Sequence, residues 1–232
     1  MSDAIPSSRL FVSHDDMPAD VWEQNVLGKT RLANHLVPFY VFVPVVIGLA
    51  AWGLLLDHVS PLRFGLALLA AIPLWTINEY VTHRFVFHYE GKSELTRKLV
   101  YTMHTGHHEY PNDKRFMLIG LNVSIPNTII TGVLFWLIVG DLWTGLLAGW
   151  LCCYLFYDWL HFATHVYNFD NRIFRLLKKH HMQHHFKYND KNFGVVSSLW
   201  DWIVGTKLRK QQVESELPTG SSDMIPDELQ RQ

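Results

Sequence analysis

An unbroken run of uncharged residues at 36–56 constrains the fold of this chain more than any other feature. The run has 21 residues, contains no Asp, Glu, Lys or Arg, and is dominated by large apolar side chains. At about 1.5 Å per residue, a helix of this length crosses a hydrocarbon core of about 30 Å. A soluble helical bundle is the alternative, but it seldom contains so long an uncharged segment. The run therefore predicts a membrane-spanning helix.

Three further apolar segments extend this pattern. The second expected span covers residues 64–81, and the third and fourth cover residues 116–139 and 142–160. Gly140 and Asp141 separate the last two segments, which predicts a tight reversal between them. The sequence thus predicts an all-α integral membrane protein with four transmembrane helices in two hairpins.

The distribution of positive charge predicts the orientation of these spans. Three Lys or Arg residues precede the first span, six lie between the second and third, and ten follow the fourth. Only Arg63 falls in a loop on the other side. Because cytoplasmic loops carry the excess of Lys and Arg, both termini and the central loop are expected in the cytoplasm.

The same pattern divides the chain into three expected parts. A cytosolic N-terminal segment covers residues 1–35, a membrane domain covers residues 36–210, and a polar flexible tail covers residues 211–232. The first residues lack the basic and then apolar layout of a cleavable signal peptide. The net charge is −1 and no long polybasic block is present, so nucleic acid is not an expected partner.

Histidines gather after the second and fourth expected spans. The chain has 14 histidines, and eleven of them fall in these two places. An even number of crossings separates the two groups, so both emerge on the same membrane face. They can therefore converge on one site, although 52 residues lie between His108 and His161.

The spacing of these histidines is that of ligand sets. "HTGHH" and "HMQHH" each place histidines at i, i+3 and i+4, on one face of a helix, and "HFATH" is an i, i+4 pair. In "HRFVFH" the spacing is i, i+5, about 140° apart on an ideal helix, which requires a helix end or a bulge near the second histidine. The predicted metal ligands, through which catalysis would occur, are His83, His88, His104, His107, His108, His161, His165, His181, His184 and His185. His14, His35, His58 and His180 fall outside this register.

Ten imidazoles are more than one metal ion binds, which favours two metals with about five ligands each. Imidazole suits iron, zinc, copper and nickel, so the ligand type alone does not select the element. An iron pair with neutral imidazole ligands would retain an open position for dioxygen, and a site at a membrane face offers lipid for oxidation. A histidine-rich metal-sensing loop of a transporter is the competing interpretation, but such loops tend to be low-complexity runs.

The four motifs in this order resemble the fatty acid hydroxylase superfamily of membrane di-iron enzymes. "NEYVTHRFVFH", "HHEYPNDKRFM" and "NFGVVSSLWDWIVGT" are similar to its fatty acid 2-hydroxylase branch, and the resemblance covers residues 60–207. It implies a four-helix membrane domain with a cytosolic helical cap that holds a dinuclear metal site. It also implies two iron ions, dioxygen as co-substrate, and monooxygenase insertion of oxygen into an acyl C–H bond of a membrane lipid, at or near C-2.

The chain departs from the family pattern at its start. Eukaryotic members of this branch carry a fused cytochrome b5 domain, and the 35 residues before the first span are too few for one. A separate electron-transfer protein, such as cytochrome b5 or a ferredoxin, is therefore expected. Desaturation, sterol or carotenoid oxidation, and a non-enzymatic metal transporter or sensor remain open alternatives. Zinc can replace iron at nitrogen sites during preparation.

Two acidic residues are expected to support the ligands. Glu79 lies four residues before His83, and Asp158 lies three before His161, so each can reach toward an imidazole on its own helix face. His180 directly precedes His181 and lies about 100° away from it around a helix, so it is expected to face away from the metals. Substitution of His180 should therefore be tolerated far better than substitution of His181.

Overall fold

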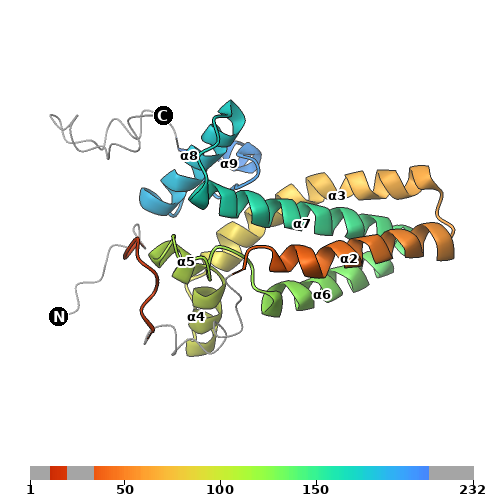
Figure 1. Cartoon of the computed structure of the whole chain (residues 1–232), viewed down its shortest axis with the longest axis horizontal. Coiled ribbons are helices and arrows are strands. Elements are labelled where there is room, and N and C mark those ends of the chain that lie inside the picture. Colours follow the sequence, from red (N-terminus) through yellow and green to blue (C-terminus); the bar gives the residue numbers. More distant parts are fainter. Residues whose placement is uncertain (1–10, 20–33, 209–232) are drawn as a thin grey trace.

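A computed structural model describes residues 11–19 and 34–208, and within these residues every regular element is helical. The predicted tail at 211–232 and most of the predicted 1–35 segment lie outside the described residues. Four long helices lie side by side in one elongated bundle (Figure 1). They are α2 (Val37–Ala51), α3 (Pro61–Val81), α6 (Leu121–Val139) and α7 (Trp143–Val166).

Local sequence explains where two of these helices begin. Pro61 is the first residue of α3, where its missing N–H costs nothing, and the Ser60 side chain accepts a hydrogen bond from the Arg63 N–H. Helix α2 likewise has a proline in its first turn and continues into a π-helical turn, Trp52–Leu56. Gly140 ends α6 with a positive φ of 59°, which turns the chain back toward α7.

Helix α7 is the central element, because it packs against α2, α3 and α6. Its glycines allow a close approach to α3. A Cβ added at Gly149 would lie 2.2 Å from the Leu68 carbonyl oxygen, and one at Gly145 would lie 3.0 Å from the Phe64 carbonyl oxygen. Small residues four apart are the usual means by which membrane helices come into backbone contact. The α3–α7 pair is therefore the closely packed base on which the site is built.

Three helical segments are long and apolar enough to cross a membrane: Val37–Leu56, Pro61–Phe87 and Leu121–Val166. The third is 46 residues long and contains both α6 and α7, which reverse at Gly140. The Tyr154 hydroxyl donates to the Ile119 carbonyl, and Gly132 faces Leu147, so the two helices run side by side. Ile129, Leu137 and Ile138 of α6 point outward and are more than half exposed, as expected of side chains that face lipid.

The helices differ from the expected spans at their ends. Helix α6 begins at Leu121 rather than at residue 116, because Phe116 and Met117 are buried in the loop that precedes it. Helix α7 continues six residues beyond residue 160 to Val166, and α3 continues through a π-helical turn, Thr82–Phe87. In both helices the apolar sequence ends before the helix does. The additional helical turns carry histidines.

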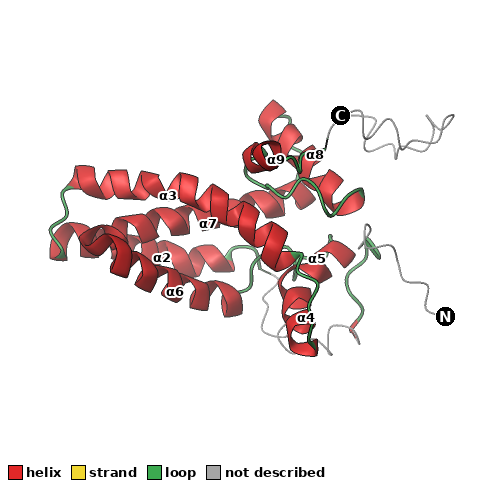
Figure 2. Ribbon diagram, turned by 180° about the vertical axis from the view of Figure 1, so that it is seen from behind, coloured by secondary structure: helices red, strands yellow, loops and turns green. Residues whose placement is uncertain are grey.

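Further helices gather at one end of the bundle, where these extra turns emerge (Figures 1 and 2). They are α4 (Glu94–Val100), α5 (Gly106–Glu109), α8 (Arg172–Phe186) and α9 (Leu199–Val204). A third π-helical turn, Tyr101–Thr105, joins α4 to α5. This end of the molecule therefore collects the histidine motifs from segments that lie far apart in the sequence.

Candidate metal centre

The ten histidines selected by spacing form two clusters of five. Within each cluster the ring nitrogens lie within 4.8 Å of one another. Cluster 1 contains His83, His88, His104, His108 and His184, and cluster 2 contains His107, His161, His165, His181 and His185. Among the described residues, His14, His35, His58 and His180 belong to neither cluster.

The π-helical turn Thr82–Phe87 brings the i, i+5 pair together. The His88 N–H donates to the His83 carbonyl, which is the i→i+5 hydrogen bond of a π-helix. Both side chains then reach cluster 1, although an ideal α-helix would hold them about 140° apart. The expected bulge near His88 is confirmed.

The two H-x-x-H-H motifs are each divided between the clusters. His104 and His108, four residues apart, enter cluster 1, while His107 between them enters cluster 2. On α8 the arrangement is reversed, because His181 and His185 enter cluster 2 and His184 enters cluster 1. Each motif thus supplies an i, i+4 pair to one cluster and its i+3 histidine to the other.

Distances between ring nitrogens fit metal coordination. Two nitrogens bound at about 2.1 Å to one metal, about 90° apart, lie about 3.0 Å from each other. In cluster 1 the Nε2 atoms of His83 and His104 lie 2.9 Å apart, and those of His88 and His184 lie 3.1 Å apart. In cluster 2 the Nε2 atoms of His165 and His181 lie 3.0 Å apart. Both ring nitrogens of His185 are buried without a hydrogen-bond partner, so either could bind a metal.

Burial keeps these imidazoles neutral. Burial, followed by the proximity of other histidines, lowers the pKa of His104 and His108 in the α4–α5 region well below its usual value. The same two causes lower the pKa of His181, His184 and His185 on α8. A neutral imidazole keeps a nitrogen lone pair for a metal, so the electrostatics of this end of the molecule favour metal ligation over proton binding.

Backbone carbonyls orient several of the rings. The second ring nitrogen, Nδ1, donates to the Phe193 carbonyl in His83 and to the Lys191 carbonyl, at 2.6 Å, in His184. In cluster 2 the His161 ring bonds to the Met117 carbonyl. Because Nδ1 is committed to a carbonyl, Nε2 is presented to the cluster, which is the usual arrangement of metal-binding histidines.

The two acids that were expected to bond to the imidazoles bond instead to backbone N–H groups of nearby loops. Both ring nitrogens of His83 have other neighbours, and Oε1 of Glu79 instead accepts the N–H groups of Val195 and Val196, at 2.5 and 2.9 Å. Oδ1 of Asp158 accepts the Ile119 N–H at 3.2 Å. Each acid therefore holds a loop whose carbonyl, two residues earlier, orients a histidine.

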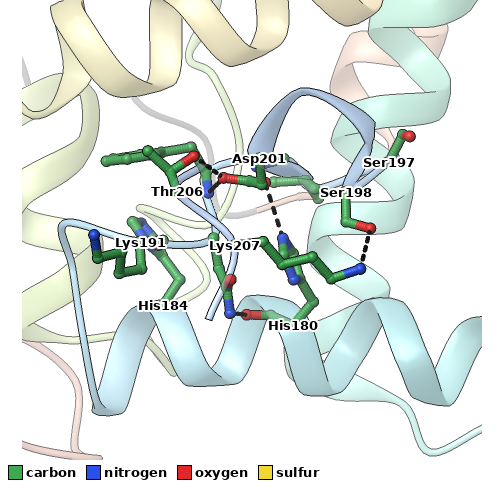
Figure 3. A network of polar contacts seen from close by, with 12 residues as sticks. His180, His184, Lys191, Ser197, Ser198, Asp201, Thr206 and Lys207 are labelled. Carbon is green, nitrogen blue, oxygen red and sulfur yellow. Dashed lines mark hydrogen bonds and ion pairs between the residues drawn. The ribbon is translucent and has the colours of Figure 1, made fainter. Parts of the chain in front are cut away.

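Asp201 is also part of the site, although the spacing argument that selected Glu79 and Asp158 did not select it. It is fully buried and bonds to His180, whose Nε2 lies 3.0 Å from Oδ2 (Figure 3). The only indication in the sequence was an acid between two tryptophans, "LWDW", which is equally typical of a helix near a membrane surface. His180 faces away from the clusters, as expected, but its side chain is buried and has a hydrogen-bond partner.

Comparisons with known proteins show which proteins this chain is similar to. The family model described as fatty acid hydroxylase matches residues 68–206. Dihydroceramide fatty acyl 2-hydroxylase FAH2 of Arabidopsis thaliana is 35% identical over 151 residues, which cover 62% of this chain and 61% of the relative. FAH1 of the same plant is 34% identical over 178 residues, which cover 72% of this chain and 70% of the relative.

A solved structure shares the fold as well. It is described as "Full length scs7p (only hydroxylase domain visible)" and superposes with a TM-score of 0.72 at 28% identity, covering 78% of this chain and 68% of that chain. The chain spans about three fifths of the length of FAH2. All ten clustered histidines fall inside the segment that the family model matches. The chain belongs to the fatty acid hydroxylase family.

Proposed function

We propose that this chain is a membrane monooxygenase that hydroxylates an acyl chain of a membrane lipid, at or near C-2. Family membership makes it an oxidoreductase of the hydroxylase type, and the relatives FAH1 and FAH2 are named as acyl 2-hydroxylases that act on dihydroceramide. The observation that carries the proposal is the pair of adjoining five-histidine clusters, which offers sites for two metals side by side.

One iron ion would occupy each cluster. His83, His88, His104, His108 and His184 would hold the first, and His107, His161, His165, His181 and His185 the second. When bound, the iron pair supplies the oxygen chemistry, with the balance RH + O2 + 2 electrons + 2 protons giving ROH + H2O. Imidazole also suits zinc, so a zinc-loaded preparation is compatible with an iron enzyme.

The chain's own contribution is to hold the imidazoles and to exclude water. His107, His108, His181, His184 and His185 are each at most 2% exposed, and His88 and His165 are partly buried, so most of the centre is shielded from bulk solvent. The carbonyls of Lys191 and Phe193 hold two rings of cluster 1 in one tautomer and one orientation. A shielded site of this kind limits the leakage of reactive species during oxidation.

The proposed membrane arrangement has four crossings, formed by α2, α3, α6 and α7 as two hairpins. Support comes from the outward-facing apolar side chains of α6 and from the reversal at Gly140 inside the third candidate span. The count of Lys and Arg residues favours a cytoplasmic position for both termini and for the end that carries the histidines. A membrane lipid would then reach the centre from the bilayer.

Electrons would come from a separate protein, such as cytochrome b5 or a ferredoxin. Helix α8 offers basic residues for such a partner, and Arg172 and Lys179 are exposed. Arg175 instead pairs with Asp170 at 3.1 Å, and Lys178 bonds to the Tyr167 carbonyl at 2.9 Å. If α8 docks an acidic donor, reduction should slow as salt increases, because salt screens the attraction. A rate that does not change with salt would contradict docking at this helix.

Lipid analysis tests the proposed function. Cells that produce the intact chain should accumulate acyl chains with a new hydroxyl group, whereas cells that produce His184→Ala at the same level should not. Mass spectrometry of released fatty acids locates the hydroxyl. Unchanged acyl chains together with oxidised sterols or carotenoids would move the substrate elsewhere in the superfamily. Unchanged lipids with altered cellular metal content would instead favour a metal carrier.

A further inference from the structure

One loop, residues 191–196, supplies the carbonyls that orient cluster 1. Lys191 accepts a hydrogen bond from Nδ1 of His184, and Phe193 accepts one from Nδ1 of His83. Both histidines belong to cluster 1. We call this segment the carbonyl loop.

The conformation of the carbonyl loop is fixed at Asn192. This residue has a φ of 57°, in the left-handed region that asparagine tolerates better than most residues. Its N–H donates to the Thr206 carbonyl, and its side-chain oxygen accepts the Leu208 N–H. Its side-chain amide donates to the His180 carbonyl. These contacts hold the turn that places the carbonyls of residues 191 and 193 beside the cluster.

Two buried carboxylates receive four consecutive peptide N–H groups of this loop. Asp201 accepts those of Phe193 and Gly194, both at 2.8 Å, and Glu79 accepts those of Val195 and Val196. Asp201 belongs to α9 and Glu79 to α3, so the loop is held from both sides. No peptide N–H of residues 193–196 is left to compete for the carbonyls that face cluster 1.

Asp201 has two further partners (Figure 3). The Thr206 hydroxyl donates to Oδ1 at 2.8 Å, and Nε2 of His180 donates to Oδ2 at 3.0 Å. Each carboxylate oxygen therefore accepts two hydrogen bonds. Despite its burial, which alone raises the pKa of a carboxyl group, the hydrogen bonds from His180, Gly194 and Thr206 hold the pKa of Asp201 below its usual value. An amide at this position could accept only half of these hydrogen bonds.

Cluster 2 is oriented by a different segment. The His161 ring bonds to the Met117 carbonyl, and Asp158 accepts the Ile119 N–H two residues further along. The Tyr154 hydroxyl donates to the Ile119 carbonyl at 3.3 Å. Asp158 and Tyr154 both lie on α7, whereas Asp201 lies on α9 and Glu79 on α3.

We propose that each cluster has its own acidic support, and that the affinities of the two metal sites are set separately. Asp201, Glu79 and His180 are positioning residues for cluster 1, acting through the carbonyl loop. Asp158 is a positioning residue for cluster 2, acting through the segment before α6. This inference rests on the proposed function, in which each cluster binds one metal.

Zinc binding by the purified full chain tests the inference. Wild type should take up two Zn²⁺ per chain, as measured by elemental mass spectrometry after dialysis against a weak chelator. Asp201→Asn should weaken one site by about 10–100-fold, the range found when the partner of a metal ligand is removed. Content should then fall to one Zn²⁺ per chain. Asp158→Asn is the matched control and should also leave one.

Double variants identify which site is affected. His184→Ala removes a ligand of cluster 1, so adding Asp201→Asn to it should cause no further loss of zinc. His165→Ala removes a ligand of cluster 2, so the same addition should remove the second zinc as well. Asp158→Asn should give the opposite pattern in both backgrounds.

A milder variant covers the case in which Asp201→Asn does not fold. His180→Phe keeps a ring and removes one N–H donor to Asp201, whereas His180→Gln retains an N–H donor. We expect His180→Phe to weaken cluster 1 alone and His180→Gln to restore part of the affinity. Equal weakening of both sites, or of neither, would overturn the inference. A wild-type chain that binds no zinc would overturn the proposed metal function together with it.

Discussion

His108 and His185 belong to different clusters, yet their rings stack with centroids 4.1 Å apart and 19° between the ring planes. The first lies on α5 and the second on α8, and each directly follows a histidine that serves the other cluster. The two clusters therefore contact each other directly through their imidazole rings. This exchange links the two clusters, because neither can be completed by one motif alone.

Adjacent histidines on α5 should affect different metals. Because His107 belongs to cluster 2 and His184 to cluster 1, the double variant His107→Ala with His184→Ala should lose both metals. His108 and His184 share cluster 1, so His108→Ala with His184→Ala should retain one. Elemental analysis of the two purified double variants checks this. Equal metal content in the two would mean that the division into clusters is wrong.

Neighbouring histidines on α8 should differ sharply in tolerance. His181 is a cluster 2 histidine, whereas His180 bonds to Asp201 and acts through the carbonyl loop. We expect His180→Gln to retain hydroxylation within about tenfold of wild type and His181→Gln to lose about a hundredfold or more. Hydroxylated acyl chains, normalised to the amount of protein in the membrane, give the comparison. The reverse order would show that the helical register is misassigned.

Gly194 should not accept a side chain. A Cβ at this position would lie 2.0 Å from the Ser197 carbonyl oxygen, and that atom belongs to the backbone. Gly194→Ala must therefore displace the carbonyl loop, at a cost of about 1–3 kcal/mol in the free energy of unfolding. Gly65→Ala on α3 is the control, because nothing lies within 4 Å of its Cβ. Thermal unfolding in detergent should separate the two variants, and equal stability would contradict the close contact.

Spacing alone predicted the ten histidines and the bulge at His88, but not how they divide. The i, i+3 and i+4 positions were treated as one face of an ideal helix. In the structure the centre lies between helices, so His107 turns to one side of that face while His104 and His108 turn to the other. A π-helical turn, Tyr101–Thr105, also interrupts the first motif. Helix geometry therefore selects the clustered histidines, and packing between helices divides them between the two clusters.

The supporting residues were harder to predict than the ligands. Glu79 was expected to reach the His83 imidazole, because i, i+4 spacing places them on one helix face. What lies across from that face is the backbone of residues 195 and 196, which come more than 110 positions later. The carbonyls that orient His83 and His184 belong to the main chain. A pattern of side chains in the sequence cannot predict the position of these backbone carbonyls.

The Asp113–Arg115 pair should give stability that depends on pH. Although burial raises the pKa of Asp113, hydrogen bonds from Arg115 and from the Met17 N–H bring it below its usual value. A lowered carboxyl pKa stabilises the fold above the unfolded value, and this contribution is lost as pH falls below about 4. Asp113→Asn should therefore cost about 1.5–3 kcal/mol at pH 7 and much less at pH 3. An equal difference at both pH values would exclude the charged pair as the cause.

Metal identity can be tested by reconstitution. Zinc has no redox chemistry, so the zinc-loaded chain should be inactive, although imidazole ligands bind it readily. Removal of zinc followed by anaerobic addition of ferrous iron should restore hydroxylation when a reductant is supplied. Product formation is measured by mass spectrometry of the lipid. Hydroxylation with zinc alone would exclude redox chemistry at the bound metal as the source of the activity.

Isotopic labelling of the product tests the central claim most directly. The purified iron-loaded chain, a reductant and ceramide in vesicles would be incubated under ¹⁸O2, and the released fatty acids analysed by mass spectrometry. We expect one ¹⁸O atom in a hydroxyl group at or near C-2, present with wild type and absent with His184→Ala. Acyl chains without a hydroxyl, or a hydroxyl labelled only from H2¹⁸O, would contradict hydroxylation by dioxygen at the paired histidine clusters.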